Sequence, residues 1–463
     1  MGVAVSNWRL ANAVCREGQL GVVSGTALDQ VLARRLQDGD PGGHMRRALD
    51  AFPFRAMAER VWNAFHIPGG KAPAAAYRKT PLHERESLRE LQELCVAANF
   101  VEVFLAKEGH GNPVGINYLE KIQTPHLPSI FGAMLAGVDY VLMGAGIPLK
   151  IPGILDAFAR YEPASYPLTV AGAAPAADAD TAMHFAPLEF VEGEPPELKR
   201  PFFLAIIASN TLALTMSKKA NGRVDGFIVE GHTAGGHNAP PRGKMRLSET
   251  GEPVYGERDR VDLDQLRELG LPFWLAGGFG SSIKLREALA AGAAGVQVGT
   301  AFAFCDESGF AAEFKQAVLS AVRNGNAPVF TDPVASPTGF PFKCVRVPGT
   351  VSEPEVYADR PRICDLGYLR EFYWKPDGSI GSRCAAEPVS VYSAKGGHEE
   401  NTVNRRCLCN ALMANIGHPQ VRAGKLEEPG LITAGDGIGE LARFLGTEGS
   451  SYSAAAVIRE VLG

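Results

Sequence analysis

The sequence predicts an α/β protein: a (β/α)₈ barrel of the TIM type with a mixed, partly helical subdomain inserted after the eighth strand. Three observations favour this fold. Short apolar runs rich in β-forming residues recur along the chain, segments with helical periodicity separate them, and glycine-rich turns follow the last two runs. Such a barrel builds its active site from the loops at the carboxyl ends of its strands. On pattern alone, a doubly wound sheet is the alternative.

Eight apolar runs are expected to be the strands. They cover residues 20–23, 101–105, 139–143, 167–171, 202–207, 224–229, 273–276 and 295–298. Between them lie helical patterns, such as the spacing of Leu88, Leu91, Leu94 and Ala98. The pattern therefore alternates strand and helix, as a barrel requires.

Two later stretches interrupt this alternation and set the expected domain boundaries. Residues 161–201 are rich in Ala and Pro and are expected to form a long surface connection beyond their one strand. Residues 306–429 carry many turn signals, among them Ser336-Pro337, and are too long for a loop. We therefore expect a barrel over residues 1–305, a substrate-side subdomain over 306–429, and a C-terminal helix over 430–463 that closes the barrel.

Composition and charge narrow the class of protein. Hydrophobic residues make up 46% of the 463 residues and charged residues 21%, values typical of a globular enzyme. The net charge of −5 argues against nucleic acid as a partner, because phosphate binding needs a concentrated cationic face. One local excess exists: residues 34–90 hold eleven Lys or Arg against seven Asp or Glu. A solvated surface is the favoured interpretation of this excess, and a docking face for an acidic partner is the alternative.

The sequence also predicts where the protein works. No stretch approaches the roughly 18 to 20 apolar residues of a membrane span, and polar residues such as Arg9 and Arg16 interrupt any signal peptide. A cytoplasmic location without membrane contact is therefore expected, with the eight cysteines reduced. Cys407 and Cys409 have the wrong spacing for a zinc ribbon, so no metal site is expected.

Two glycine-rich turns point to a phosphate. Gly277, Gly278 and Gly280 follow the seventh expected strand, and Gly299-Thr300 follows the eighth. Glycines let the backbone approach a phosphate closely, and free N–H groups at a helix start bind its charge. Barrels commonly bind phosphate after strands seven and eight. Either turn alone could be needed only for backbone freedom, but together they favour phosphate binding.

The segment after the sixth expected strand carries the candidate chemistry. Residues 230–237 read Glu-Gly-His-Thr-Ala-Gly-Gly-His, with three glycines within six positions and two histidines. Histidine is the side chain best suited to exchange protons near neutral pH. A lone loop histidine usually serves structure, but the glycines and the barrel position favour a catalytic His237. For His232, the sequence favours neither a catalytic nor a structural role.

Together these segments resemble a known superfamily. Ala234-Gly235-Gly236-His237, the turn at Gly277-Gly278 and the run ending at Gly299-Thr300 are similar to the signature of the nitronate monooxygenase (2-nitropropane dioxygenase-like) superfamily, which includes FMN-dependent enoyl-acyl-carrier-protein reductases. Residues 20–28, 39–47, 230–243 and 406–412 more closely resemble the trans-acting enoyl reductases of polyketide and polyunsaturated fatty acid synthases. This chain has Thr233 where simpler members have Glu, so no role is inferred from that carboxylate.

The resemblance implies a set of site residues. His237, with His232 second, would be catalytic, and backbone around Val23 to Thr26 would lie against the flavin. The full set of implied FMN-binding residues is Val23, Ser24, Gly25, Thr26, Asn117, Gly235, Gly236, Gly277, Gly278, Gly280, Gly299 and Thr300.

The same resemblance implies a reaction. An FMN-dependent enoyl reductase would use NADPH or NADH to reduce an enoyl thioester carried by an acyl carrier protein, and the enzyme could form a homodimer. Because the motifs are shared, nitronate oxidation or another oxygen-consuming flavin reaction is the alternative. A non-catalytic flavoprotein of a biosynthetic complex is the alternative of another class.

Overall fold

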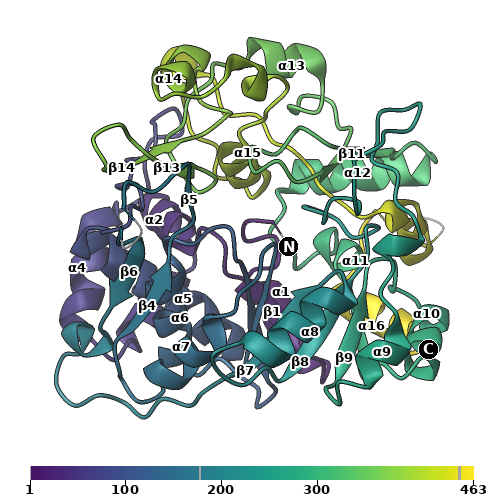
Figure 1. Ribbon diagram of the computed structural model, residues 1–463, viewed down its shortest axis with the longest axis horizontal. Coiled ribbons are helices and arrows are strands. Elements are labelled where there is room, and N and C mark those ends of the chain that lie inside the picture. Colours follow the sequence, from purple (N-terminus) through teal and green to yellow (C-terminus); the bar gives the residue numbers. More distant parts are fainter. Residues whose placement is uncertain (1, 177–178, 447–449) are drawn as a thin grey trace.

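A computed structural model describes residues 2–176, 179–446 and 450–463 (Figure 1). Its centre is one parallel sheet with the strand order β1-β2-β3-β7-β8-β9-β10. The strands are β1 (Gly21–Ser24), β2 (Val114–Leu119), β3 (Tyr140–Gly144), β7 (Phe202–Ile207), β8 (Gly226–Glu230), β9 (Phe273–Ala276) and β10 (Gly295–Gln297). Every neighbouring pair is parallel. The sheet is thus a curled, barrel-like sheet of seven strands, not eight, and β1 and β10 are its two edges.

Helices cover the outer face of this sheet. Those around the first strands are α1 (Trp8–Arg16), α2 (Leu28–Gln37), α3 (His44–Asp50), α4 (Arg55–Phe65), α5 (Arg89–Lys107), α6 (His126–Leu135) and α7 (Ile151–Phe158). Those around the later strands are α8 (Asn210–Lys219), α9 (Leu263–Arg267), α10 (Ser282–Ala290) and α11 (Thr300–Ala303), while the short η2 (Glu257–Asp259) lies in the loop after β8. The main core lies between sheet and helices, and a smaller cluster, with Leu142, Leu204, Ile228 and Ala276, fills the inner face.

Two of the eight expected strands do not belong to the central sheet. Residues 101–105 lie inside α5, which is buried on nearly all sides, so its apolar run has no polar face to reveal the helical period. Residues 167–171 do not join the central sheet. They contain the end of β4 (Ala164–Pro167), which pairs with β6 (Ala182–Phe185), and β5 (Val170–Ala171), which pairs with β13. Strand β2 was not predicted, because Gly115 and Asn117 interrupt its apolar run.

Residues 306–429, called the post-barrel region from here on, lie over the carboxyl ends of the central strands, at the top of Figure 1. Its elements are α12 (Ala312–Arg323), β11 (Val329–Asp332), β12 (Phe342–Val345), α13 (Pro354–Asp359), β13 (Glu371–Trp374), β14 (Ile380–Arg383), α14 (Val389–Ala394), η3 (Glu399–Thr402) and α15 (Leu408–Asn415). Because β5 pairs with β13, the insertion that contains β4, β6 and η1 (Pro187–Phe190) is joined to this region by a sheet.

The chain then returns to the barrel. Its last elements are η4 (Ala423–Lys425), η5 (Asp436–Phe444) and α16 (Ala454–Leu462). Helix α16 packs against α1, α10 and α11, beside the edge strand β10. No helix in the described ranges is both long and apolar enough to span a membrane.

Candidate functional site

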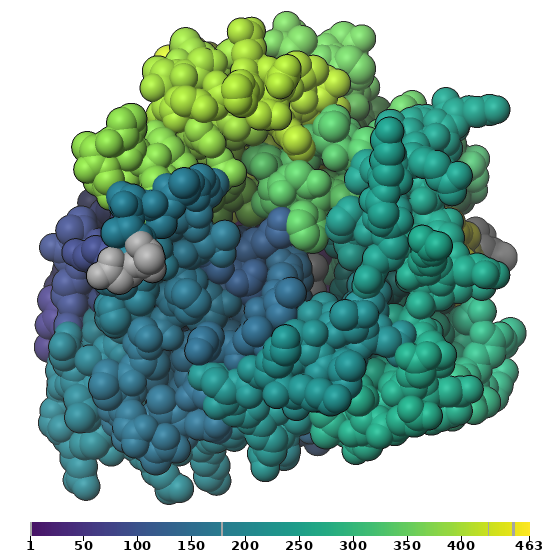
Figure 2. Space-filling view, viewed as in Figure 1, coloured from purple at the N-terminus to yellow at the C-terminus, as the bar shows by residue number. Residues whose placement is uncertain are grey.

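A cavity of about 490 Å³ opens at the carboxyl ends of the central strands. Its walls come from the ends of β1, β2, β3, β7 and β8 and from the loop that follows β8. The post-barrel region supplies an apolar roof, formed by Phe340, Phe342, Leu366, Tyr368, Leu408 and Leu412. Figure 2 shows the surface hollowed where this green region meets the teal segment that follows β8. A ligand here would lie between a barrel floor and a roof distant in sequence.

Polar side chains at the floor come from the inner face of the sheet. Side chains alternate along a strand, so Glu230 shares the inward face of β8 with Ile228, a member of the inner cluster. Asn117 lines the cavity from β2, and its Oδ1 is buried without a hydrogen-bond partner among the described residues. A buried amide oxygen rarely stays unpaired, because its desolvation costs free energy. Asn117 therefore marks a place where a ligand donor fits.

Glu230 was not predicted as a site residue. It lines the cavity, and removal from water raises the pKa of its carboxyl to about 7. It therefore changes charge near neutral pH inside the cavity. Its place at the end of an apolar strand is the one sequence signal that could have indicated it.

His237 lies in the cavity wall under the roof. Its Nε2 is 2.7 Å from the Ser336 hydroxyl, and its ring packs edge-on against Phe342, with 4.9 Å between the ring centres. Removal from water, and secondly the nearby Lys121 ammonium, lower the pKa of His237 to about 3. The imidazole is therefore neutral over the physiological range.

His232 also lines the cavity but is exposed. Its ring stacks on Tyr255, with 4.4 Å between the ring centres and 14° between the planes. Both residues of this pair line the cavity.

Lys121 is a second residue that the sequence did not indicate. Its Nζ lies 3.2 Å from the centre of the Phe340 ring, which is part of the roof. Burial lowers the pKa of this ammonium to about 8. Lys121 therefore places a positive charge behind the cavity wall, close to His237.

The glycines after β8 allow a tight backbone crossing. A Cβ on Gly235 would lie 2.7 Å from the Ala434 carbonyl carbon and 2.8 Å from the Gly435 nitrogen. Gly236 N–H donates to Thr433 Oγ1 at 2.8 Å, and Asp436 N–H donates to Thr233 O at 3.0 Å. Residues 433–436 were not predicted to take part, yet they hold this loop in place.

The expected phosphate turns lie beside this loop and do not line the cavity. A Cβ on Gly277 would lie 2.8 Å from Thr233 Oγ1, and Thr300 Oγ1 accepts a hydrogen bond from Gly435 N–H at 2.9 Å. A Cβ on Gly299 would meet no atom within 4 Å, and a Cβ on Gly278 would meet only Thr233 Oγ1, at 3.9 Å.

The structure brings some of the expected site residues together around the cavity and leaves others outside. The residues that line it are Ser24, Thr26, Asn117, His232, Gly235, Gly236 and His237. The expected residues outside its lining are Val23, Gly25, Gly277, Gly278, Gly280, Gly299 and Thr300. Val23 is fully buried, and a Cβ on Gly25 would lie 2.3 Å from the Tyr118 ring, so Gly25 serves close packing.

The fold and the cavity define a parallel α/β protein with a cavity at the carboxyl ends of its strands. Within it, residues 197–333, from before β7 through β11, match the nitronate monooxygenase family model. The matched segment includes the loop with Gly235, Gly236 and His237 and both glycine turns. No protein of a curated set matches the chain.

Solved structures of low sequence identity align over most of the chain. FabK from Thermotoga maritima is 16% identical with a TM-score of 0.45, covering 99% of this chain and 88% of that one. Nitroalkane oxidase from Streptomyces ansochromogenes is 16% identical with a TM-score of 0.45, covering 100% and 92%. The enoyl reductase domain of MlnA from the macrolactin biosynthesis cluster of Bacillus amyloliquefaciens is 10% identical with a TM-score of 0.47, covering 100% and 90%.

Proposed function

We propose that this protein is an FMN-dependent enoyl reductase that acts on an enoyl thioester carried by an acyl carrier protein. The observation that carries the proposal is the cavity itself. Its floor offers an unpaired amide at Asn117 and a glycine-rich wall, while its roof is apolar. A planar polar ring and an acyl chain need these two kinds of surface.

The residues present fit a bound FMN. The unpaired Asn117 Oδ1 suits an N–H on the edge of a flavin ring, and Gly236, where a Cβ would meet no atom within 4 Å, leaves room for a flat ligand beside the backbone. The neighbouring turns at Gly277, Gly278, Gly280, Gly299 and Thr300 would hold the phosphate, because glycine turns leave backbone N–H groups accessible. When bound, FMN would supply the hydride transfer between NADPH or NADH and the double bond.

The protein's own groups would orient the substrate and manage its proton. The apolar roof would hold the acyl chain, since burying apolar surface is favourable. Two cavity residues can interact with a proton near the α-carbon: His237, neutral and held by Ser336, and Glu230, whose pKa of about 7 lets it carry a proton at neutral pH. We therefore assign the proton donor to this pair, with Glu230 as the group that changes charge.

The basic excess of residues 34–90 gives little support to a docking face. Arg34 is 3% exposed, while Arg46, Arg47 and Arg60 form ion pairs with Glu59, Glu108 and Glu93. We therefore infer the acyl carrier protein from the proposed thioester substrate and not from this surface.

Nitronate oxidation is the second candidate, favoured by the family model that matches residues 197–333. It needs a base near a small polar substrate. Against it, the low pKa of His237 makes its imidazole a weak base.

The test is to purify the protein, record the flavin spectrum and mix it anaerobically with NADPH, NADH or an alkyl nitronate. We expect bleaching by a nicotinamide and reoxidation by an enoyl-pantetheine. Bleaching by the nitronate alone would replace the reductase with the second candidate. Bound flavin without bleaching by any of them would indicate a non-catalytic flavoprotein.

A further inference from the structure

The two nitrogen atoms of the His237 ring have different surroundings. Nε2 lies 2.7 Å from Ser336 Oγ. Nδ1 forms no hydrogen bond with a described residue, yet it is not one of the buried unpaired nitrogen atoms, as Nδ1 of His83 and Nδ1 of His126 are. Because His237 lines the cavity, its Nδ1 is therefore open to a ligand there.

The backbone around Ser336 is held by two charged side chains. Arg405 Nη1 donates to the Val334 carbonyl at 2.8 Å and to the Ser336 carbonyl at 2.5 Å. Asp332 Oδ1 accepts the Val334 N–H at 2.9 Å. Ser336 itself is fully buried. These contacts fix the serine hydroxyl beside Nε2 of His237.

The hydroxyl protons of this site determine which imidazole nitrogen carries the proton. Ser336 Oγ accepts the Thr338 N–H at 3.2 Å and lies 2.8 Å from Thr338 Oγ1. If Ser336 donates to His237 Nε2, the Thr338 hydroxyl can donate to Ser336 Oγ, and both hydroxyl protons are bonded. If Nε2 carried the proton instead, Ser336 would donate to Thr338, whose own hydroxyl proton would have no acceptor among the described residues. The first arrangement is favoured, because polar groups removed from water are normally paired.

The charge of His237 limits what Nδ1 can do. Burial, and secondly the nearby Lys121 ammonium, lower the pKa of the imidazole to about 3, so the ring is neutral. A neutral ring whose Nε2 accepts a hydrogen bond carries its proton on Nδ1. This N–H is a very weak acid near neutral pH, but it is a hydrogen-bond donor, and a neutral imidazole of this kind can polarise a carbonyl group.

We propose that His237 donates a hydrogen bond from Nδ1 to the thioester carbonyl oxygen of the substrate, and that Ser336 is the positioning residue that holds the ring in this tautomer. The inference rests on the proposed enoyl reductase function. Donors aimed at an oxygen on which negative charge develops contribute strongly to catalysis. Within the pair of Glu230 and His237, the histidine is thus assigned to the oxygen and the glutamate to the α-carbon.

Electrons and protons balance in this step. Hydride, supplied by the reduced flavin of the proposed function, forms a C–H bond at the β-carbon, and the π pair of the double bond moves toward the carbonyl group. Negative charge develops on the oxygen that accepts from Nδ1. Glu230 lines the same cavity, and its pKa of about 7 lets it carry a proton at neutral pH. Its carboxylic acid gives that proton to the α-carbon and becomes a carboxylate, so His237 ends the step unchanged.

The tautomer is tested on the full-length protein as purified, by ¹⁵N NMR with both ring nitrogens of histidine labelled. The chain has ten histidines, and the His237 signals are those missing from the spectra of His237→Asn and His237→Gln. Near neutral pH we expect the shift of a protonated nitrogen at Nδ1 and that of an unprotonated nitrogen at Nε2. Ser336→Ala should give a mixture of both tautomers, because the ring loses its donor at Nε2. A wild-type ring protonated at Nε2, or at both nitrogens, would overturn the proposal whichever reaction the protein catalyses.

A matched pair of substitutions tests the role of Nδ1 in turnover. An Asn amide N–H can take the place of Nδ1, whereas the longer Gln side chain places its amide near Nε2. His237→Gln should lower kcat by on the order of a hundredfold, the loss typical of one oxyanion donor, whereas His237→Asn should lose less than about tenfold. Flavin content, which should be equal in both, is the control for folding.

A residue that transfers a proton would give a different result, since neither amide titrates and both variants would lose kcat alike. Equal losses in the two variants, or a smaller loss in His237→Gln, would therefore overturn the proposal. A wild type that reduces no enoyl thioester would refute the proposed function and with it the assignment to the carbonyl oxygen, while the NMR spectra would still decide the tautomer.

Discussion

The imidazole Nε2 of His237 lies 2.7 Å from the Ser336 hydroxyl, so a side chain of the loop after β8 is held by the connection between β11 and β12. Ser336 is fully buried, and its Oγ also lies 2.8 Å from Thr338 Oγ1. The ring of Phe342 packs edge-on against the same imidazole. The post-barrel region therefore does more than cover the cavity, because it sets the orientation of a cavity side chain.

This contact predicts that His237 and Ser336 act together. His237→Ala should keep bound FMN but slow turnover by roughly tenfold or more, the lower end of what a positioned proton-transfer group contributes. Ser336→Ala should slow kcat in the same direction, and Ser336→Thr should restore part of it, since the hydroxyl positions the ring. The measurement is kcat and KM over a range of pH. Ser248→Ala, in an exposed loop, is the control. Unchanged turnover in His237→Ala would remove this histidine from the mechanism.

The raised pKa of Glu230 predicts that the free energy of unfolding depends on pH. Its folded-state pKa of about 7 lies above the ordinary value of 4.5, so the native protein holds this proton more tightly than the unfolded chain does. The associated stabilisation is complete below pH 4.5 and is lost as pH rises through about 7. Glu230→Gln stays neutral, so it should match the wild type near pH 4 and exceed it at pH 8 by on the order of 3 kcal/mol.

The measurement for Glu230 is urea unfolding of the ligand-free protein at both pH values. Glu249→Gln is the matched control, because this residue is exposed in the loop after β8. A stability difference between Glu230→Gln and the wild type that does not change with pH would contradict the prediction.

Local sequence pattern was sufficient for six of the eight expected strands and insufficient for those at 101–105 and 167–171. The predicted strands at 202–207 and 273–276 coincide with β7 and β9, because each is a continuous apolar run bounded by turn residues. Residues 101–105 are also a continuous apolar run, but α5 is buried on nearly every side, and burial of that kind erases the helical period. Strand β5 depends on its pairing with β13, a contact between segments about 200 residues apart that no local pattern encodes.

The same distinction applies to the site. The loop with Gly235, Gly236 and His237 is continuous in sequence, so its pattern was visible. Ser336 and Lys121 reach the cavity wall from distant segments and carry no motif of their own. The low pKa of His237 arises from the burial that those segments cause, so the neutral state of the imidazole could not be predicted from the sequence.

Gly235 predicts a purely steric effect. A Cβ there would lie 2.7 Å and 2.8 Å from backbone atoms of Ala434 and Gly435, which cannot rotate away. Gly235→Ala should therefore push the loop from residues 433–436, cost about 1–3 kcal/mol of folding free energy and weaken FMN retention. Gly256→Ala is the control, because a Cβ at that position meets no atom within 4 Å. Thermal melting and flavin content after gel filtration are the measurements, and equal losses in both variants would argue against the steric explanation.

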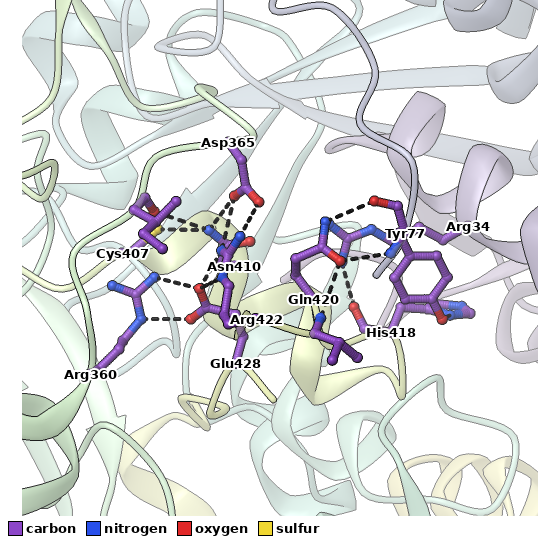
Figure 3. Close-up of polar contacts among 12 residues, drawn as sticks. Arg34, Tyr77, Arg360, Asp365, Cys407, Asn410, His418, Gln420, Arg422 and Glu428 are labelled. Atoms are coloured by element: carbon purple, nitrogen blue, oxygen red, sulfur yellow. Dashed lines mark hydrogen bonds and ion pairs between the residues drawn. The ribbon is translucent and has the colours of Figure 1, made fainter. Parts of the chain in front are cut away.

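Arg422 predicts how strongly the post-barrel region depends on its buried charges. Its guanidinium contacts Asp365 at 2.6 Å and also pairs with Glu428, which in turn binds Arg360 at 2.6 Å (Figure 3). The side chains of Asp365 and Glu428 are each only 1% exposed. Removal of one partner from a buried ion pair leaves a desolvated charge behind, which costs far more than the pair itself contributes.

Arg422→Met should therefore destabilise the protein by about 3–5 kcal/mol, because it keeps the length of the side chain but leaves Asp365 with Asn410 as its one remaining hydrogen-bond partner among the described residues. Arg160→Met is the matched control, since the Arg160–Glu162 pair is exposed to solvent and should leave the Tm unchanged. Denaturant unfolding followed by Trp fluorescence distinguishes the two. If Arg422→Met unfolds at the same denaturant concentration as Arg160→Met, water or a rearranged cation must compensate the charge of Asp365. The ion-pair network would then not be what holds α15 against the segment at Asp365.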